Sequence, residues 1–145
     1  MDHFWKGVLG VLGTIGTYAS YLLGGWDAAI SIMFMVMAID YVTGILCAVR
    51  GKSDKTPGGA FSSRVAFSGI TKKLMMLLII MLAVALDRLM GTDSVCRIAA
   101  IGFYVANEGM SIVENAAVLG VPFPQSLLRV LETLKSRDGD EKTGA

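Results

Sequence analysis

Residues 28–49 read AAISIMFMVMAIDYVTGILCAV, and residues 50–73 read RGKSDKTPGGAFSSRVAFSGITKK. The first stretch is long enough to cross a bilayer as a helix, which takes about 20 mostly apolar residues, and its one charge is Asp40. The second stretch holds six basic residues and one acidic residue. Short basic loops stay in the cytoplasm while their neighbours insert. The contrast therefore predicts a multi-pass membrane protein with a central cytoplasmic loop. Its expected topology determinants are Arg50, Lys52, Lys55, Arg64, Lys72 and Lys73.

The composition supports a membrane protein and excludes several other classes. Hydrophobic residues make up 54% of the 145 residues and charged residues only 17%, which is too apolar for an ordinary soluble domain. The net charge of +1 is uninformative as a sum, but the distribution of charges gives no pervasive basic surface, so no nucleic-acid partner is expected. His3 is the only histidine and lies at a terminus, so no histidine-based catalytic or metal site is available. We expect no enzyme activity and no cofactor.

The hydrophobic pattern predicts an all-α integral membrane protein with a transmembrane domain over residues 1–120. The candidate spans lie near residues 7–24, 28–49, 70–90 and 98–119. Four spans would place both termini and the basic loop in the cytoplasm. Three spans are the alternative, because the first segment is rich in glycine and the last is the most polar; either could lie at the interface.

The C-terminal part is expected to leave the membrane. Pro122 and Pro124 end the last span, because proline lacks a backbone donor and restricts the residue before it. Leucines at helical spacing within residues 121–136 predict a short amphipathic helix, on the membrane surface or against a partner subunit. Residues 137–145 carry mixed charge and two glycines and are expected to be disordered.

Two features of the first two spans are candidates for helix packing and assembly. Gly10, Gly13 and Gly16 recur three residues apart, and small residues let helix backbones approach closely in lipid. This ridge predicts an oligomerisation face, although glycine is common in membrane helices and the ridge could pack within its own subunit. Asp40 is costly in lipid unless it is neutral, hydrated or paired. It indicates an aqueous path, an assembly determinant, or a carboxylate bonded to a neighbouring helix.

The last span carries a polar arc on one side of the helix. At about 100° per residue, five polar side chains fall within an arc of about 120°. They are Asn107, Glu108, Ser111, Glu114 and Asn115. Such a face is typical of a pore wall or a subunit interface, and packing within one subunit is the alternative.

Several motifs are informative when taken together. They are Asp40-Tyr41-Val42-Thr43-Gly44, Ser62-Ser63, Gly69-Ile70-Thr71-Lys72-Lys73, Asp87, the run FYVANEGMSIVEN at residues 103–115, and LGVPFP at residues 119–124. In these motifs, and across roughly residues 27–135, the chain resembles the toxin-secretion/phage-lysis holin family.

The resemblance implies a protein of the bacterial cytoplasmic membrane that forms homo-oligomers in the lipid bilayer. At a set time such a protein opens large lesions in the membrane. A cell-wall hydrolase (endolysin) or a toxin leaves through these lesions and does not need to contact the holin directly. The alternative is a small cation or multidrug transporter or channel that uses the membrane carboxylates. Against it, the two halves of the chain show no inverted repeat.

Overall fold

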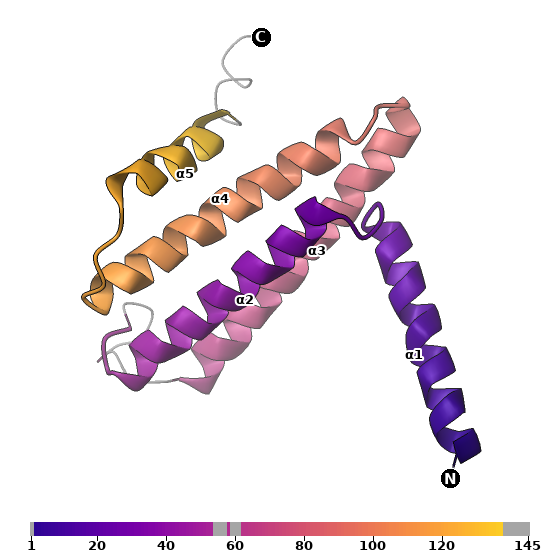
Figure 1. Cartoon of the computed structure of the whole chain (residues 1–145), viewed down its shortest axis with the longest axis horizontal. Coiled ribbons are helices and arrows are strands. Elements are labelled where there is room, and N and C mark those ends of the chain that lie inside the picture. Colours follow the sequence, from indigo (N-terminus) through magenta and orange to yellow (C-terminus); the bar gives the residue numbers. More distant parts are fainter. Residues whose placement is uncertain (1, 54–57, 59–61, 138–145) are drawn as a thin grey trace.

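The computed structural model describes residues 2–53, 58 and 62–137, and this part of the chain is helical without a strand. Its helices are α1 (Asp2–Leu22), α2 (Ala28–Val49), α3 (Ser63–Met90), α4 (Val95–Val118) and α5 (Gln125–Arg137), as Figure 1 shows. The all-α class is therefore confirmed. Lys55 and most of the tail expected to be disordered, residues 138–145, lie outside the described residues.

The helix boundaries follow from capping residues. Asp27 caps α2, since its side chain accepts a hydrogen bond from the Ile30 amide at 3.0 Å. Gly91 ends α3 in the left-handed conformation, with φ of +68°, which glycine adopts without strain. Helix α3 begins at Ser63, several residues before the expected span start near residue 70, because nothing in between breaks a helix. Helix α5 begins only after Pro124, rather than at residue 121.

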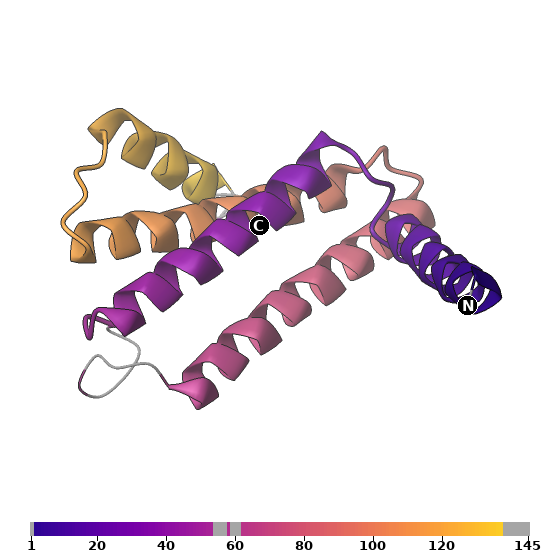
Figure 2. The ribbon, with the colours of Figure 1, turned by 60° about the horizontal axis from the view of Figure 1, so that its bottom comes forward.

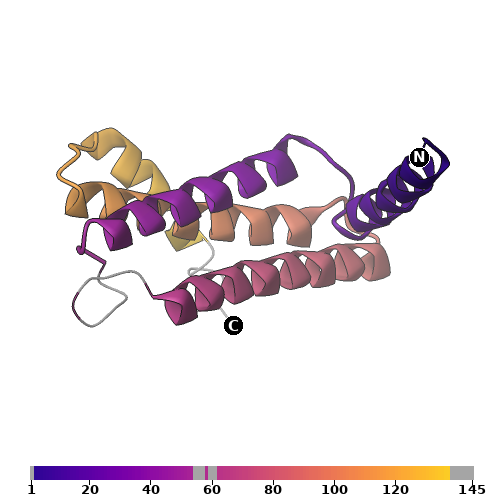
Figure 3. The same cartoon turned by 90° about the horizontal axis from the view of Figure 1, so that it is seen from below.

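Helix α4 is the centre of the bundle. It lies along both α2 and α3, whereas α2 and α3 contact each other sparsely, and α5 folds back against α4 (Figures 2 and 3). The α5 contact is close, because a Cβ added at Gly109 would lie 2.7 Å from Leu131 Cδ2. The amphipathic helix therefore packs on α4 of its own chain. The buried apolar core between the central helices is Leu23, Ile30, Met33, Met37, Ile80 and Ile101.

Helix α1 extends away from the bundle (Figure 1). A Cβ added at Gly10, Gly13 or Gly16 would meet no atom within 4 Å, so the glycine ridge has no packing partner in the described part of the chain. Packing of the ridge within its own subunit is thus not observed. Its role between subunits stays a prediction.

In the part of the chain that the structure describes, two helices, α2 and α3, are long and apolar enough to cross a membrane. Helix α1 is diluted by glycine and hydroxyl residues, and α4 by its polar arc, so neither meets the same criterion of length and composition. The four-span arrangement is therefore not confirmed by the structure.

The link between α1 and the bundle is held by a buried arginine. Arg97 is only 3% exposed; its Nη1 donates to Asp27 Oδ2 at 2.7 Å and its Nε donates to the Leu23 carbonyl at 2.7 Å. The hydrogen bond from Arg97 to the Asp27 carboxylate lowers the pKa of Asp27 to about 2, below the usual 3.8. Gly24 is required beside it, with φ of +82° and an added Cβ only 2.8 Å from Arg97 Cδ. No larger residue fits there without displacing the arginine.

Asp87 ties α3 to the start of α4 at the same end of the bundle. Its carboxylate accepts hydrogen bonds from the backbone amides of Cys96 at 2.9 Å and Arg97 at 2.8 Å, and from the Thr92 hydroxyl at 2.5 Å. The first amides of a helix have no partner within the helix, so Asp87 supplies the cap that α4 needs. This sets the direction in which α4 leaves the turn.

Candidate functional site

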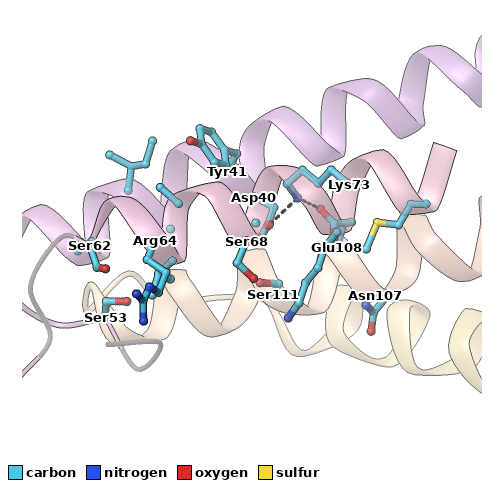
Figure 4. Close-up of a pocket in the computed structure, with 18 residues that line it drawn as sticks. Asp40, Tyr41, Ser53, Ser62, Arg64, Ser68, Lys73, Asn107, Glu108 and Ser111 are labelled. Atoms are coloured by element: carbon cyan, nitrogen blue, oxygen red, sulfur yellow. Dashed lines mark hydrogen bonds and ion pairs between the residues drawn. The ribbon is translucent and has the colours of Figure 1, made fainter. Parts of the chain in front are cut away.

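Three charged side chains from three helices meet inside the bundle. Lys73 of α3 donates to Asp40 Oδ2 of α2 at 2.8 Å and forms a second ion pair with Glu108 of α4 (Figure 4). Asp40 is 7% exposed and Glu108 is 5% exposed, and the side chain of Lys73 is 14% exposed. One cation thus serves two buried carboxylates. We call Asp40, Lys73 and Glu108 the charged cluster.

Asn115 extends the charged cluster along the α2–α4 contact. Its Nδ2 donates to the Thr43 hydroxyl at 3.0 Å and lies 3.4 Å from Asp40 Oδ1. Thr43 in turn donates to the Asp40 carbonyl at 3.0 Å, one turn earlier on α2. Polar groups of the two helices are therefore satisfied by one another along about two turns.

Helical periodicity places these residues on facing sides. Asp40 and Thr43 are three residues apart on α2, and Glu108, Ser111 and Asn115 follow spacings of three and four on α4, so each set lies on one face. These two polar faces meet each other, and the remaining surface of α2 carries exposed apolar side chains. The sequence therefore places a polar contact beside the buried apolar core and apolar side chains on the outer surface of α2.

A cavity of about 530 Å³ adjoins the charged cluster between α2, α3 and α4. Apolar atoms and backbone form part of its wall, and Figure 4 shows most of its polar side chains. The polar and charged lining residues are Asp40, Tyr41, Ser53, Ser62, Arg64, Ser68, Lys72, Lys73, Asn107, Glu108 and Ser111. The cavity thus runs from the charged cluster to the start of α3.

The structure brings together most of the residues expected to line a pore or an interface. Asp40, Asn107, Glu108 and Ser111 share the cavity, and Asn115 bonds to Asp40. Only one member of the polar arc stands apart. Glu114 is exposed and does not line the cavity. Their roles in assembly stay a prediction.

The basic residues named as topology determinants divide into three groups. Arg50 and Lys52 are exposed and do not line the cavity, whereas Arg64 and Lys72 are exposed and do line it. Lys73 differs, because its ammonium group points into the bundle and neutralises carboxylates. Lys73 was expected only as a topology determinant, and that role does not account for its ion pairs inside the bundle.

Sequence reasoning missed the ion pairs between helices. The pairing of Lys73 with Asp40 and Glu108 had one weak signal, since a cation is one of the ways in which carboxylates in apolar spans can be stabilised. The pairing of Arg97 with Asp27 spans 70 residues, and no local spacing indicates it. Asp87 entered the sequence analysis only as part of a family motif, not as the cap of α4.

The chemistry of the site is electrostatic. Among the described residues no group of three or more His, Cys, Asp and Glu side chains could hold a metal ion. Removing two carboxylates and an ammonium group from water costs several kcal/mol per ion, which mutual pairing offsets only with good geometry. The site is suited to holding helices in one register and to solvating polar groups.

Comparisons with known proteins agree with this description. The sequence model of the bacteriophage holin family matches residues 17–136. A probable holin of Bacillus phage phi105 is 34% identical over 114 residues, which cover 79% of this chain and 78% of that protein. An uncharacterized protein of Clostridium perfringens strain 13 is 35% identical over 120 residues, covering 82% and 84% of the two chains. No solved structure matches the chain.

Together, the apolar helices and these matches define a non-enzymatic membrane protein. Within that class, the chain belongs to the bacteriophage holin family. The match includes α2 to α5 almost completely but only the last residues of α1. The charged cluster, the cavity and the Arg97 contact therefore all lie in the part of the chain that matches the family.

Replacing Lys73 with Met should destabilise the protein by about 3–5 kcal/mol, because it leaves two buried carboxylates without their cation. Thermal unfolding of the detergent-solubilised protein measures the change. Lys72→Met is the matched control, since it removes the neighbouring, exposed cation, and it should cost less than about 0.5 kcal/mol. Adding Asp40→Asn and Glu108→Gln to Lys73→Met should restore part of the loss. Equal costs for the Lys73 and Lys72 variants would contradict the role of the cluster.

Proposed function

We propose that this protein is a holin that oligomerises in the cytoplasmic membrane of a bacterial host and opens lesions large enough to release a folded cell-wall hydrolase or toxin. The observation that carries the proposal is the convergence of polar side chains from α2, α3 and α4 inside apolar helices of a holin-family chain. Release requires no direct contact with the released protein. Host lysis then follows from cell-wall hydrolysis.

In the proposed topology four helices cross the membrane and both termini are cytoplasmic. The basic loop after α2 supports this orientation. The polar groups of α4 support its insertion beside α2 and α3, because Glu108 and Asn115 are bonded to these helices. A helix too polar to insert alone is accommodated when its neighbours supply partners.

Assembly in this proposal is driven by the cost of polar surface in lipid. Glu114 is exposed on α4, and Gly10, Gly13 and Gly16 form an uncovered ridge on α1. Subunits lower their free energy by turning the carboxylate toward water or another subunit and by packing the ridges against one another. A ring formed in this way encloses the lesion.

Reporter fusions test the orientation. A reporter that is active only in the cytoplasm should be active both after Ser53 and after Ala145. In the four-span arrangement two spans lie between these sites, so both sites are on the cytoplasmic side. A reporter that requires export should be inactive at both positions. If the fusions showed Ser53 and Ala145 on opposite sides of the membrane, the four-span arrangement would be excluded.

Co-expression with a cytoplasmic murein hydrolase tests the function. Induction of the protein with the hydrolase should cause abrupt lysis after a delay, and induction of either alone should not. Release of a folded cytoplasmic enzyme into the medium, measured by its activity, distinguishes a holin from a transporter, which passes only ions or small solutes. Leakage of small solutes without release of the enzyme would contradict the proposal.

Glu114→Ala tests the exposed side of the polar arc. The variant should insert normally, because it removes a costly group from lipid, but it should remain dispersed and delay or abolish lysis. Chemical crosslinking should give monomers where the parent gives ladders. Glu132→Ala is the matched control, since it removes a carboxylate from an exposed site on α5. If lysis and crosslinking were unchanged in Glu114→Ala, the proposed role of Glu114 in assembly would be wrong.

A further inference from the structure

The cavity has a basic mouth that the charged cluster does not use. Arg64, in the first turn of α3, and Lys72, about two turns further along the helix, both line the cavity and are both exposed, so this part of the cavity is reachable from outside. Ser62 and Ser68 line it beside them. In Figure 4, Arg64 lies near Ser62 and Ser53, away from the ion pairs of Lys73. We call Ser62, Arg64, Ser68 and Lys72 the basic mouth.

The charge of the lining favours an anion. Three cations and two carboxylates line the cavity, and Lys73 already pairs with both carboxylates. Within residues 2–53, 58 and 62–137, neither Arg64 nor Lys72 forms an ion pair. The two cations of the basic mouth therefore keep their donors for a ligand. Guanidinium and ammonium groups bind phosphate through charge-assisted hydrogen bonds.

The first turn of α3 adds to the positive potential. Ser62 is the N-cap, and its side chain makes no capping hydrogen bond within the described residues. The first amides of a helix lack partners inside it, and the helix dipole favours an anion at this end. Since Ser62, Arg64 and Val65 all line the cavity, this helix end faces the same space as the two cations.

The surroundings of the mouth are those of a lipid site. Phe67 and Ile70 lie on the same turns of α3 as the basic residues and are 71% and 51% exposed, and Val49 of α2 is 71% exposed. Such surfaces suit acyl chains, whereas a soluble anion would have no use for them. The cavity volume also lies within the range of about 300–1,000 Å³ that is typical of small-ligand sites.

We propose that the basic mouth binds the phosphate headgroup of an anionic phospholipid, with Arg64 and Lys72 on the phosphate and the serine hydroxyls on the headgroup's polar atoms. Basic pockets between helices on the cytoplasmic side are suited to such headgroups, so the inference rests on the proposed orientation of the loop.

Lipid binding can be measured on the full-length protein in an uncharged detergent. Calorimetric titration with dihexanoyl phosphatidylglycerol should give saturable binding, and Arg64→Gln with Lys72→Gln should weaken it at least tenfold. The matched control is Arg50→Gln with Lys52→Gln, which removes the same charge from exposed residues that do not line the cavity, and should change affinity less than twofold. Ser68→Phe should block binding without any loss of charge.

Three results would overturn the proposal. Equal weakening in the two double variants would show diffuse attraction to the loop rather than a site. Equal affinity for dihexanoyl phosphatidylcholine would remove the preference for an anionic lipid, and equal affinity for inorganic phosphate would identify a soluble anion as the ligand. The measurement needs neither a lesion nor a defined orientation in a membrane. Failure of lysis with intact lipid binding, or the reverse, therefore separates this inference from the proposed function.

Discussion

The bundle depends on one lysine that neutralises two carboxylates from different helices. Helices α2 and α3 contact each other sparsely, so Lys73 joins them through Asp40 at 2.8 Å and joins both to α4 through Glu108. Apolar packing is not directional in the way hydrogen bonds are, whereas a buried ion pair offsets its desolvation cost only in a good geometry. The charged cluster therefore fixes the rotation and register of three helices whose remaining contacts are mainly apolar.

A second polar anchor lies at the end of the bundle where α1 joins α2 and where α3 turns into α4, and it has a different function. Arg97 holds the end of α1 and the start of α2 through Leu23 and Asp27, and Asp87 caps α4 beside it. The two anchors together set the length over which α4 can lie against α2. Among the described residues, α1 meets the bundle at its C-terminal end, where Arg88 of α3 also donates to the Tyr21 carbonyl at 2.6 Å and lies over the Tyr21 ring.

The sequence predicted the helices better than it predicted their contacts. Helix α2 has the expected bounds of residues 28–49, because a long apolar run flanked by Asp27 and Arg50 is a local signal. The polar arc of α4 was also visible locally, and four of its five members face α2, α3 or the cavity. The partners of Lys73 and Arg97 were not predictable, since 33 to 70 residues separate each pair and helical periodicity carries no information about a second helix. The exposure of Glu114 depends on how α4 is rotated, which those same ion pairs decide.

The internal pairing also limits how a proposed lesion can form. Within one chain the charged cluster is already satisfied, so assembly gains nothing by exposing it unless water or another subunit replaces each partner. Two features lie on the outside of the subunit instead: the exposed carboxylate of Glu114 on α4 and the uncovered glycine ridge of α1. If assembly begins with contacts of these outer features, the ion pairs of the charged cluster stay intact. No charged group of the cluster then has to be separated from its partner. The proposed lesion is therefore most favourably built from subunits that retain the fold of α2, α3 and α4.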